Sequence, residues 1–148
     1  MPIVLDASIT LAWVHSQPPA EATHAQQILL VDDALVPAIW PAEVANGLLV
    51  AERRGMLTAD QRTSFLALLR RLDIAVEATG AELTLSVTLN LARDHGLSVY
   101  DAMYLELARR EGVPLATLDS RVREAATRLG ITILEPESDP TLTDPKDT

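Results

Sequence analysis

The sequence contains no cysteine and a single lysine, and aromatic side chains make up only 3% of its 148 residues. Without cysteine, the chain can form no disulfide, thiolate nucleophile or cysteine-ligated zinc site. No apolar run approaches the roughly 18–20 residues that span a bilayer, so we expect no membrane segment. The first residues carry no basic stretch and meet an acid at Asp6, unlike a signal peptide. These absences favour a protein of the reducing cytoplasm.

The negative charge is unevenly distributed. The formal net charge is −9, of which residues 135–148 carry −4 and residues 1–134 carry −5. Four of the charges on residues 1–134 belong to the candidate site described below, so the rest of this part is close to neutral. General nucleic-acid binders are basic, and this chain is not one. A nuclease that meets phosphate through metal ions is compatible with this balance, and the eleven arginines suit phosphate contacts.

Short apolar runs alternate with helical patterns. The runs predict strands over residues 3–5, 35–38, 74–76, 113–118 and 131–134. Among the predicted helices, one opens with the capping-box pair Thr58 and Gln61, and another covers 81–95 and ends at Gly96. The alternation predicts an α/β fold in three layers, with a mostly parallel sheet of about four to five short strands between helices. We expect one domain over residues 1–134 and a disordered, acidic tail over 135–148.

Four acids lie at the junctions between these elements. Asp6 and Asp119 directly follow predicted strands, whereas Glu43 and Asp101 lie in the first turns of predicted helices. Parallel α/β sheets bind ligands at the carboxyl ends of their strands, so we expect the four side chains to converge there. Crowded carboxylates raise one another's pKa values and destabilise a fold. A divalent cation relieves this repulsion, and oxygen-only ligands select Mg²⁺ or Mn²⁺.

Each acid also has an ordinary structural explanation when it is considered alone. Asp6 and Asp119 suit helix N-caps, and Ser98 with Asp101 has the form of a capping box. Capping does not explain why four acids occupy four elements at the same edge, so we favour a metal site. Tyr104 lies three residues after Asp101 on an apolar helical stripe, and we interpret it as core packing.

The segments that carry the acids resemble, in order and spacing, the four motifs of PIN-domain nucleases. They are Ile3–Ser8, Pro41–Asn46, Val99–Leu105 and Thr117–Asp119. The length and the style of the motifs are most similar to VapC-type toxins of type II toxin–antitoxin pairs. The resemblance covers essentially residues 1–134, and the acidic tail is not part of it.

This resemblance implies a PIN-like nuclease domain and a metal-dependent endoribonuclease of structured RNA, such as tRNA or rRNA. It implies that Asp6, Glu43, Asp101 and Asp119 are catalytic residues and ligands of Mg²⁺ or Mn²⁺. It further implies a VapB-type antitoxin as inhibitor and a homodimer. We expect three polar residues beside the motif acids to orient them through hydrogen bonds, namely Ser8, Asn46 and Thr117.

Two other functions are compatible with parts of the pattern. A phosphatase that uses Asp6 as its nucleophile would carry Asp-x-Asp after the first strand, but Ser8 occupies the second position. A PIN-fold protein that binds a partner without catalysis is the second alternative, and the presence of all four acids argues against it.

Overall fold

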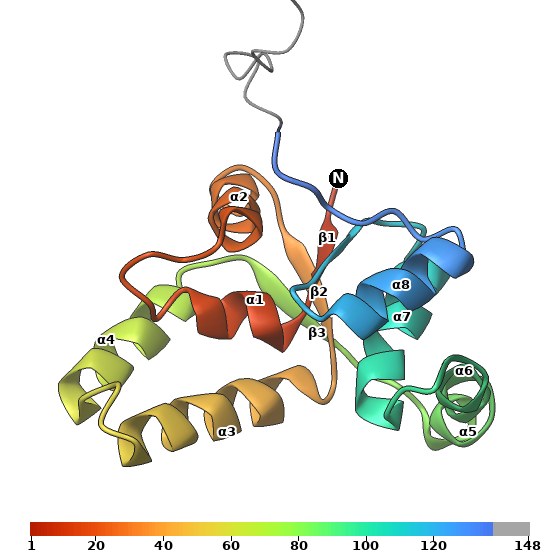
Figure 1. Cartoon of the computed structure of the whole chain (residues 1–148), viewed down its shortest axis with the longest axis horizontal. Coiled ribbons are helices and arrows are strands. Elements are labelled where there is room, and N and C mark those ends of the chain that lie inside the picture. The colour runs from red at the N-terminus through yellow and green to blue at the C-terminus, as the bar shows by residue number, and fades with distance from the viewer. Residues whose placement is uncertain (138–148) are drawn as a thin grey trace, which may run out of the picture.

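The computed structural model describes residues 1–137, and its centre is a four-stranded parallel sheet (Figure 1). Strand β1 (Ile3–Leu5) lies between β2 (Ala34–Pro37) and β4 (Leu115–Ala116), and β3 (Ile74–Glu77) forms the edge beyond β2. All pairs are parallel. The predicted α/β class with a parallel sheet is therefore confirmed. Parallel strands with both faces covered need continuous apolar sequence, which Ile3–Leu5 supplies with every side chain buried.

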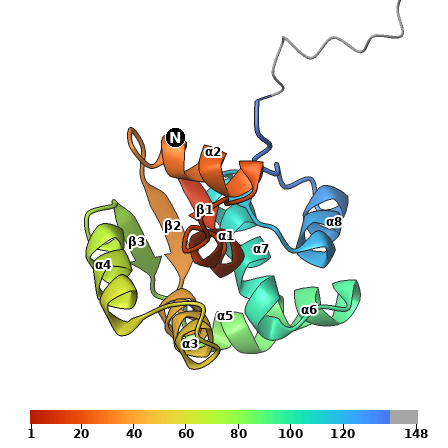
Figure 2. The ribbon, with the colours of Figure 1, turned by 60° about the vertical axis from the view of Figure 1, so that its left-hand side comes forward.

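Helices cover both faces of the sheet. One face carries α7 (Val99–Glu111), which packs on β1, β2 and β4. The opposite face carries α1 (Ala7–Ala12) and α2 (Ala20–Ile28), which lie in front of the strands in Figure 2. The remaining helices are α3 (Trp40–Arg53), α4 (Ala59–Leu69), α5 (Ala81–Leu83), α6 (Leu89–His95) and α8 (Ser120–Arg128). The predicted three layers follow from this arrangement.

The approach of α3 to α1 depends on a glycine. A Cβ atom at Gly47 would lie 2.4 Å from Cδ1 of Leu11, closer than a real carbon contact. Gly47 therefore allows the two helices to pack closely. Because Glu43 lies one turn before Gly47 on the same helix, this contact sets how near Glu43 comes to the start of α1.

Three elements differ from the sequence-based prediction. The expected strand over 113–118 is shortened to β4. The expected strand over 131–134 is reduced to a single bridge between Leu115 and Ile133. The expected helix over 81–95 contains a π-helical segment, η1 (Thr84–Thr88). Hydroxyls in and next to this segment bond back to carbonyls one turn earlier, with Ser86 donating to Glu82 at 2.6 Å. Similar bonds occur in the regular helices α4 and α8, at Thr63 and Thr127, so these bonds alone do not explain the change in helix type.

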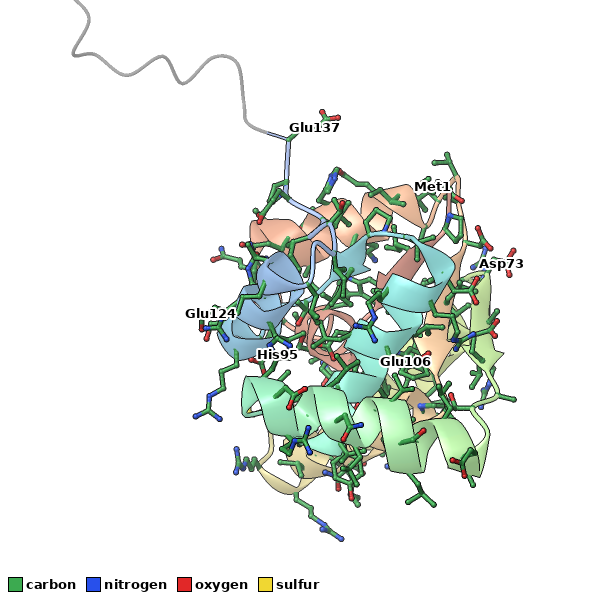
Figure 3. All side chains as sticks on the ribbon, turned by 90° about the vertical axis from the view of Figure 1, so that its right-hand side faces the viewer. Met1, Asp73, His95, Glu106, Glu124 and Glu137 are labelled. Atoms are coloured by element: carbon green, nitrogen blue, oxygen red, sulfur yellow. The ribbon has the colours of Figure 1, made fainter. Side chains whose placement is uncertain are left out.

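The described chain begins and ends at the end of the sheet opposite the carboxyl ends of its strands. In Figure 1 the N-terminus lies at the upper end, and the carboxyl ends of the strands point down toward α3. Figure 3 shows Met1 and Glu137 together at the upper end, so the described chain leaves the molecule far from the carboxyl ends of the strands. Most of the predicted tail, residues 138–148, lies outside the described residues. No helix within residues 1–137 is long and apolar enough to cross a membrane.

The predicted capping box at the start of α4 is present and yields a stability prediction. The Thr58 hydroxyl accepts from the Gln61 amide at 3.1 Å, and the Gln61 side chain accepts from the Thr58 amide at 2.9 Å. Thr58→Ala should lower the free energy of unfolding by about 1 kcal/mol, since a cap of this kind contributes that much. Urea unfolding would measure it. Ser64→Ala, at an exposed position of the same helix, should change it by less than about 0.5 kcal/mol, and equal effects of both would contradict the capping role.

Candidate active site

Asp6 is the most buried of the four acids, with 7% of its surface exposed. It directly follows β1, and the pairing of Leu5 with Ala116 places it beside Thr117 at the end of β4. Its Oδ2 atom accepts hydrogen bonds from the hydroxyls of Thr117 at 2.5 Å and Ser8 at 2.8 Å. Burial raises the pKa of Asp6, while both hydroxyls counteract the rise by bonding the charged form.

The same hydroxyls connect β1 to the loop after β4. Ser8 accepts from the amide of Leu118 and Thr117 accepts from the amide of Asp119, both at 3.1 Å. A carboxylate, two hydroxyls and two backbone amides therefore form one network with every donor directed at an acceptor. The network fixes the direction of Asp6, because both hydroxyls bond the same carboxylate oxygen, Oδ2.

Glu43 lies in the first turn of α3 and is half-buried. Its Oε1 atom accepts a hydrogen bond of 2.7 Å from the phenol of Tyr104 on α7. Burial is the largest cause of its raised pKa, and the negative charges of Asp6 and Asp101 raise the pKa further. These charge interactions place Glu43 near both acids although α3 packs mainly on α1 and α4.

Asp101 and Asp119 lie in two helix N-termini that face the same end of the sheet. Asp101 is in the first turn of α7, where its amide donates to the N-cap hydroxyl of Ser98 at 3.1 Å. Burial and the charge of Asp119 raise the pKa of Asp101. Asp119 is the N-cap of α8, and its Oδ1 atom accepts from the amides of Arg121 at 2.9 Å and Val122 at 3.3 Å. The capping explanation of Asp119 and the site explanation are therefore compatible.

The pairwise charge interactions connect all four acids into one group. The charge of Asp6 raises the pKa of Glu43, and the charge of Asp101 raises the pKa values of both. The charge of Asp119 raises the pKa of Asp101. In Glu43 and Asp119 the hydrogen bonds found within residues 1–137 all reach one carboxylate oxygen. Oxygen donors of this kind suit Mg²⁺ or Mn²⁺ chemically. No three of these side chains approach closely enough to hold an ion as they stand in the described part of the chain, so binding requires them to draw together.

The residues expected to orient the acids behave differently from one another. Ser8 and Thr117 bond directly to Asp6. Asn46 is exposed on α3 one turn after Glu43, and no side-chain hydrogen bond joins it to an acid in residues 1–137. Tyr104 is a residue that the sequence analysis assigned to packing alone, yet its hydroxyl binds Glu43. The signal that could have revealed it is its spacing of three from Asp101, which puts both residues on one face of α7.

Comparison with known proteins identifies the family. A sequence model of the PIN domain matches residues 3–128. The chain belongs to the PIN domain family. A relative, Ribonuclease VapC3 of Pyrobaculum aerophilum, is 33% identical over 129 residues, which cover 84% of this chain and 94% of that protein. The resemblance to VapC-type PIN domains noted in the sequence is therefore confirmed.

Solved structures share the fold at lower sequence identity. PAE2754 from Pyrobaculum aerophilum matches with a TM-score of 0.66 and 20% identity over 84% of each chain. VapC20 of Mycobacterium tuberculosis, described as a toxin that cleaves the sarcin–ricin loop, matches with a TM-score of 0.63 and 17% identity over 90% of this chain and 99% of that one. These likenesses show that the chain has a PIN fold.

The raised pKa values predict how the metal-free protein responds to pH. Burial makes the pKa of Asp6 higher in the folded state than in the unfolded chain. At a pH between these two values, the folded state therefore holds a proton that the unfolded chain has released. The stabilising contribution is complete below about pH 4 and is lost as the pH rises through the folded pKa. At neutral pH in EDTA, Asp6→Asn should therefore melt at a higher temperature than the wild type, and the difference should shrink toward pH 4.

Thermal melts followed by circular dichroism across this pH range would test the expectation. Asp73→Asn is the matched control, because Asp73 is exposed at the opposite end of the sheet (Figure 3). This control should follow the wild type at every pH. A lower melting temperature of Asp6→Asn at neutral pH would show that the Asp6 carboxylate stabilises the fold, contrary to the pKa argument.

Proposed function

We propose that this protein is a Mg²⁺- or Mn²⁺-dependent endoribonuclease, that Asp6, Glu43, Asp101 and Asp119 are its catalytic metal ligands, and that residues 1–134 form its nuclease domain. The observation that carries the proposal is the convergence of four carboxylates from four elements at one end of the parallel sheet. These acids would hold a divalent ion, which would supply the positive charge that promotes attack of water on a phosphodiester. The relative named as a ribonuclease supports the choice of RNA as substrate.

The residues of the chain have distinct parts in this proposal. Ser8 and Thr117 hold Asp6 in one orientation through its Oδ2 atom. The backbone amides at the start of α8 hold Asp119, and the cap of Ser98 fixes the first turn that carries Asp101. Arg121 is exposed beside Asp101, whose pKa its charge lowers. It is placed to contact a phosphate of the RNA.

The proposal also covers the class of RNA substrate, the inhibitor, the oligomeric state and the cellular compartment. Structured RNA, such as tRNA or rRNA, is the proposed substrate, which agrees with the sarcin–ricin loop named as the target of VapC20. A VapB-type antitoxin is the proposed inhibitor, and an apolar groove of about 350 Å³ between α3 and α4, lined by Trp40 and Leu69 among others, supports a docked segment. A homodimer in the cytoplasm completes the proposal. Addition of the antitoxin should stop cleavage.

Cleavage of RNA is the direct test. Purified protein free of antitoxin should cut total bacterial RNA into discrete fragments with Mn²⁺ or Mg²⁺ and leave it intact with EDTA. Asp101→Asn should lower the rate by at least about 100-fold, since removing groups that stabilise charge in a transition state has this effect. Gel analysis with mapping of the fragment ends would measure both. Asp73→Asn should cleave like the wild type, and full activity of Asp101→Asn would remove Asp101 from the site.

Metal binding can be tested without RNA. Because the ion would bind the folded state and relieve repulsion among the acids, millimolar Mn²⁺ should raise the melting temperature by several degrees. The double variant Asp6→Asn/Asp101→Asn should lose this shift. Differential scanning fluorimetry would measure it, and an equal shift in the double variant would place the ion elsewhere. A clear shift without any RNA cleavage would favour the alternative of a PIN-fold protein that only binds a partner.

A further inference from the structure

Tyr104 is a buried residue whose polar atom reaches the candidate site. Only 1% of its surface is exposed, and its ring belongs to the main hydrophobic core. Its hydroxyl donates to Oε1 of Glu43 at 2.7 Å, across 61 positions of the sequence. A buried phenol needs a hydrogen-bond partner, but an apolar ring of the same shape would need none. The hydroxyl therefore has a role that the packing of the ring does not explain.

Glu43 depends on this bond more than Asp6 or Asp119 depends on any single donor. Asp6 accepts from two hydroxyls, and Asp119 accepts from two amides of its own helix. Within residues 1–137, Tyr104 is the side-chain donor found for Glu43. Glutamate also has one more rotatable bond than aspartate, so an unanchored Glu43 carboxylate would sample more positions and lose more entropy on binding a ligand.

We propose that Tyr104 is a positioning residue, whose hydroxyl holds Oε1 of Glu43 and so presents Oε2 as a ligand to the divalent cation. The inference rests on the proposed function. It follows from a general property of metal sites, in which groups that bond to the ligands orient them and their loss weakens metal affinity by about 10- to 100-fold. Helix α7 would then contribute Asp101 as a ligand and, through Tyr104, would also hold Glu43 of α3 in position.

The variant Tyr104→Phe separates the hydroxyl from the ring. The ring fills the same core volume, so the fold should be kept, and circular dichroism would verify this. Isothermal titration with Mn²⁺ should give a dissociation constant about tenfold higher than that of the wild type. RNA cleavage should recover toward the wild-type rate at saturating Mn²⁺, because the hydroxyl itself does not touch the reacting atoms.

A double-mutant cycle shows whether Tyr104 acts through Glu43. Glu43→Ala should weaken Mn²⁺ binding on its own, and adding Tyr104→Phe to it should cause no further loss. Tyr100→Phe is the matched control, because Tyr100 is on the same helix and 58% exposed. This control should bind Mn²⁺ like the wild type.

The wild type offers a readout that needs no change at position 104. The chain has two tyrosines, so labelling of the phenol carbon should give two NMR signals, which Tyr100→Phe assigns. Titration with diamagnetic Mg²⁺ should move the signal of Tyr104 and leave that of Tyr100 in place. Saturation of the protein with Mg²⁺ without movement of the Tyr104 signal would overturn the proposal.

Other outcomes are equally decisive. Wild-type Mn²⁺ affinity in Tyr104→Phe would overturn the positioning role and leave the proposed function intact. An equal loss of affinity in the Glu43→Ala background would also overturn it, since the hydroxyl would then act elsewhere. Failure of the wild type to bind Mn²⁺ would instead refute the proposed function, and with it this role of Tyr104.

Discussion

Burial of neighbouring carboxylates at one end of the sheet is the physical constraint on which the candidate site depends. Three of the four acids have raised pKa values, with burial as the leading cause and a neighbouring acid as a further one. A protein selected for stability alone would avoid such a group. The surrounding residues reduce the penalty without removing it, because each donor occupies one oxygen of an acid and leaves its charge. In the proposed function, a divalent cation would supply the positive charge that offsets this penalty.

Much of this arrangement could be predicted from the sequence because it is local. A strand that ends in an acid and continues into a helix, as at Asp6, places the acid at the carboxyl end of the sheet whenever the strands are parallel. The same holds for Asp119, and the hydroxyls of Ser8 and Thr117 are within two residues of these acids. Local capping rules likewise predicted the start of α4. In each case the side chain and its partners lie in one short segment or in paired strands.

The features that the sequence did not reveal depend on distant contacts or on close energetic balance. The bond from Tyr104 to Glu43 joins two helices that are far apart in the chain. From sequence alone, a tyrosine on an apolar stripe is equally compatible with core packing and with a hydrogen bond to an acid. The π-helical segment has no explanation in the local sequence pattern, because the hydroxyl bonds found there also occur in regular helices. The predicted final strand has apolar sequence, but β4 itself has two residues, so a neighbour beyond it can form little more than a bridge.

The net negative charge of the chain affects how the proposed nuclease would bind RNA. The molecule has a net charge of −9, and an RNA backbone approaching uncompensated acids would be repelled over the Debye length of about 8 Å. One divalent cation would offset two of the five net negative charges that residues 1–134 carry, and the arginines, such as Arg121 beside Asp101, would then contribute more to the local field. In the proposed function, the acids that would bind the cation would also make RNA binding depend on it. The preference for RNA encounters of the metal-loaded protein would then come from the acids themselves.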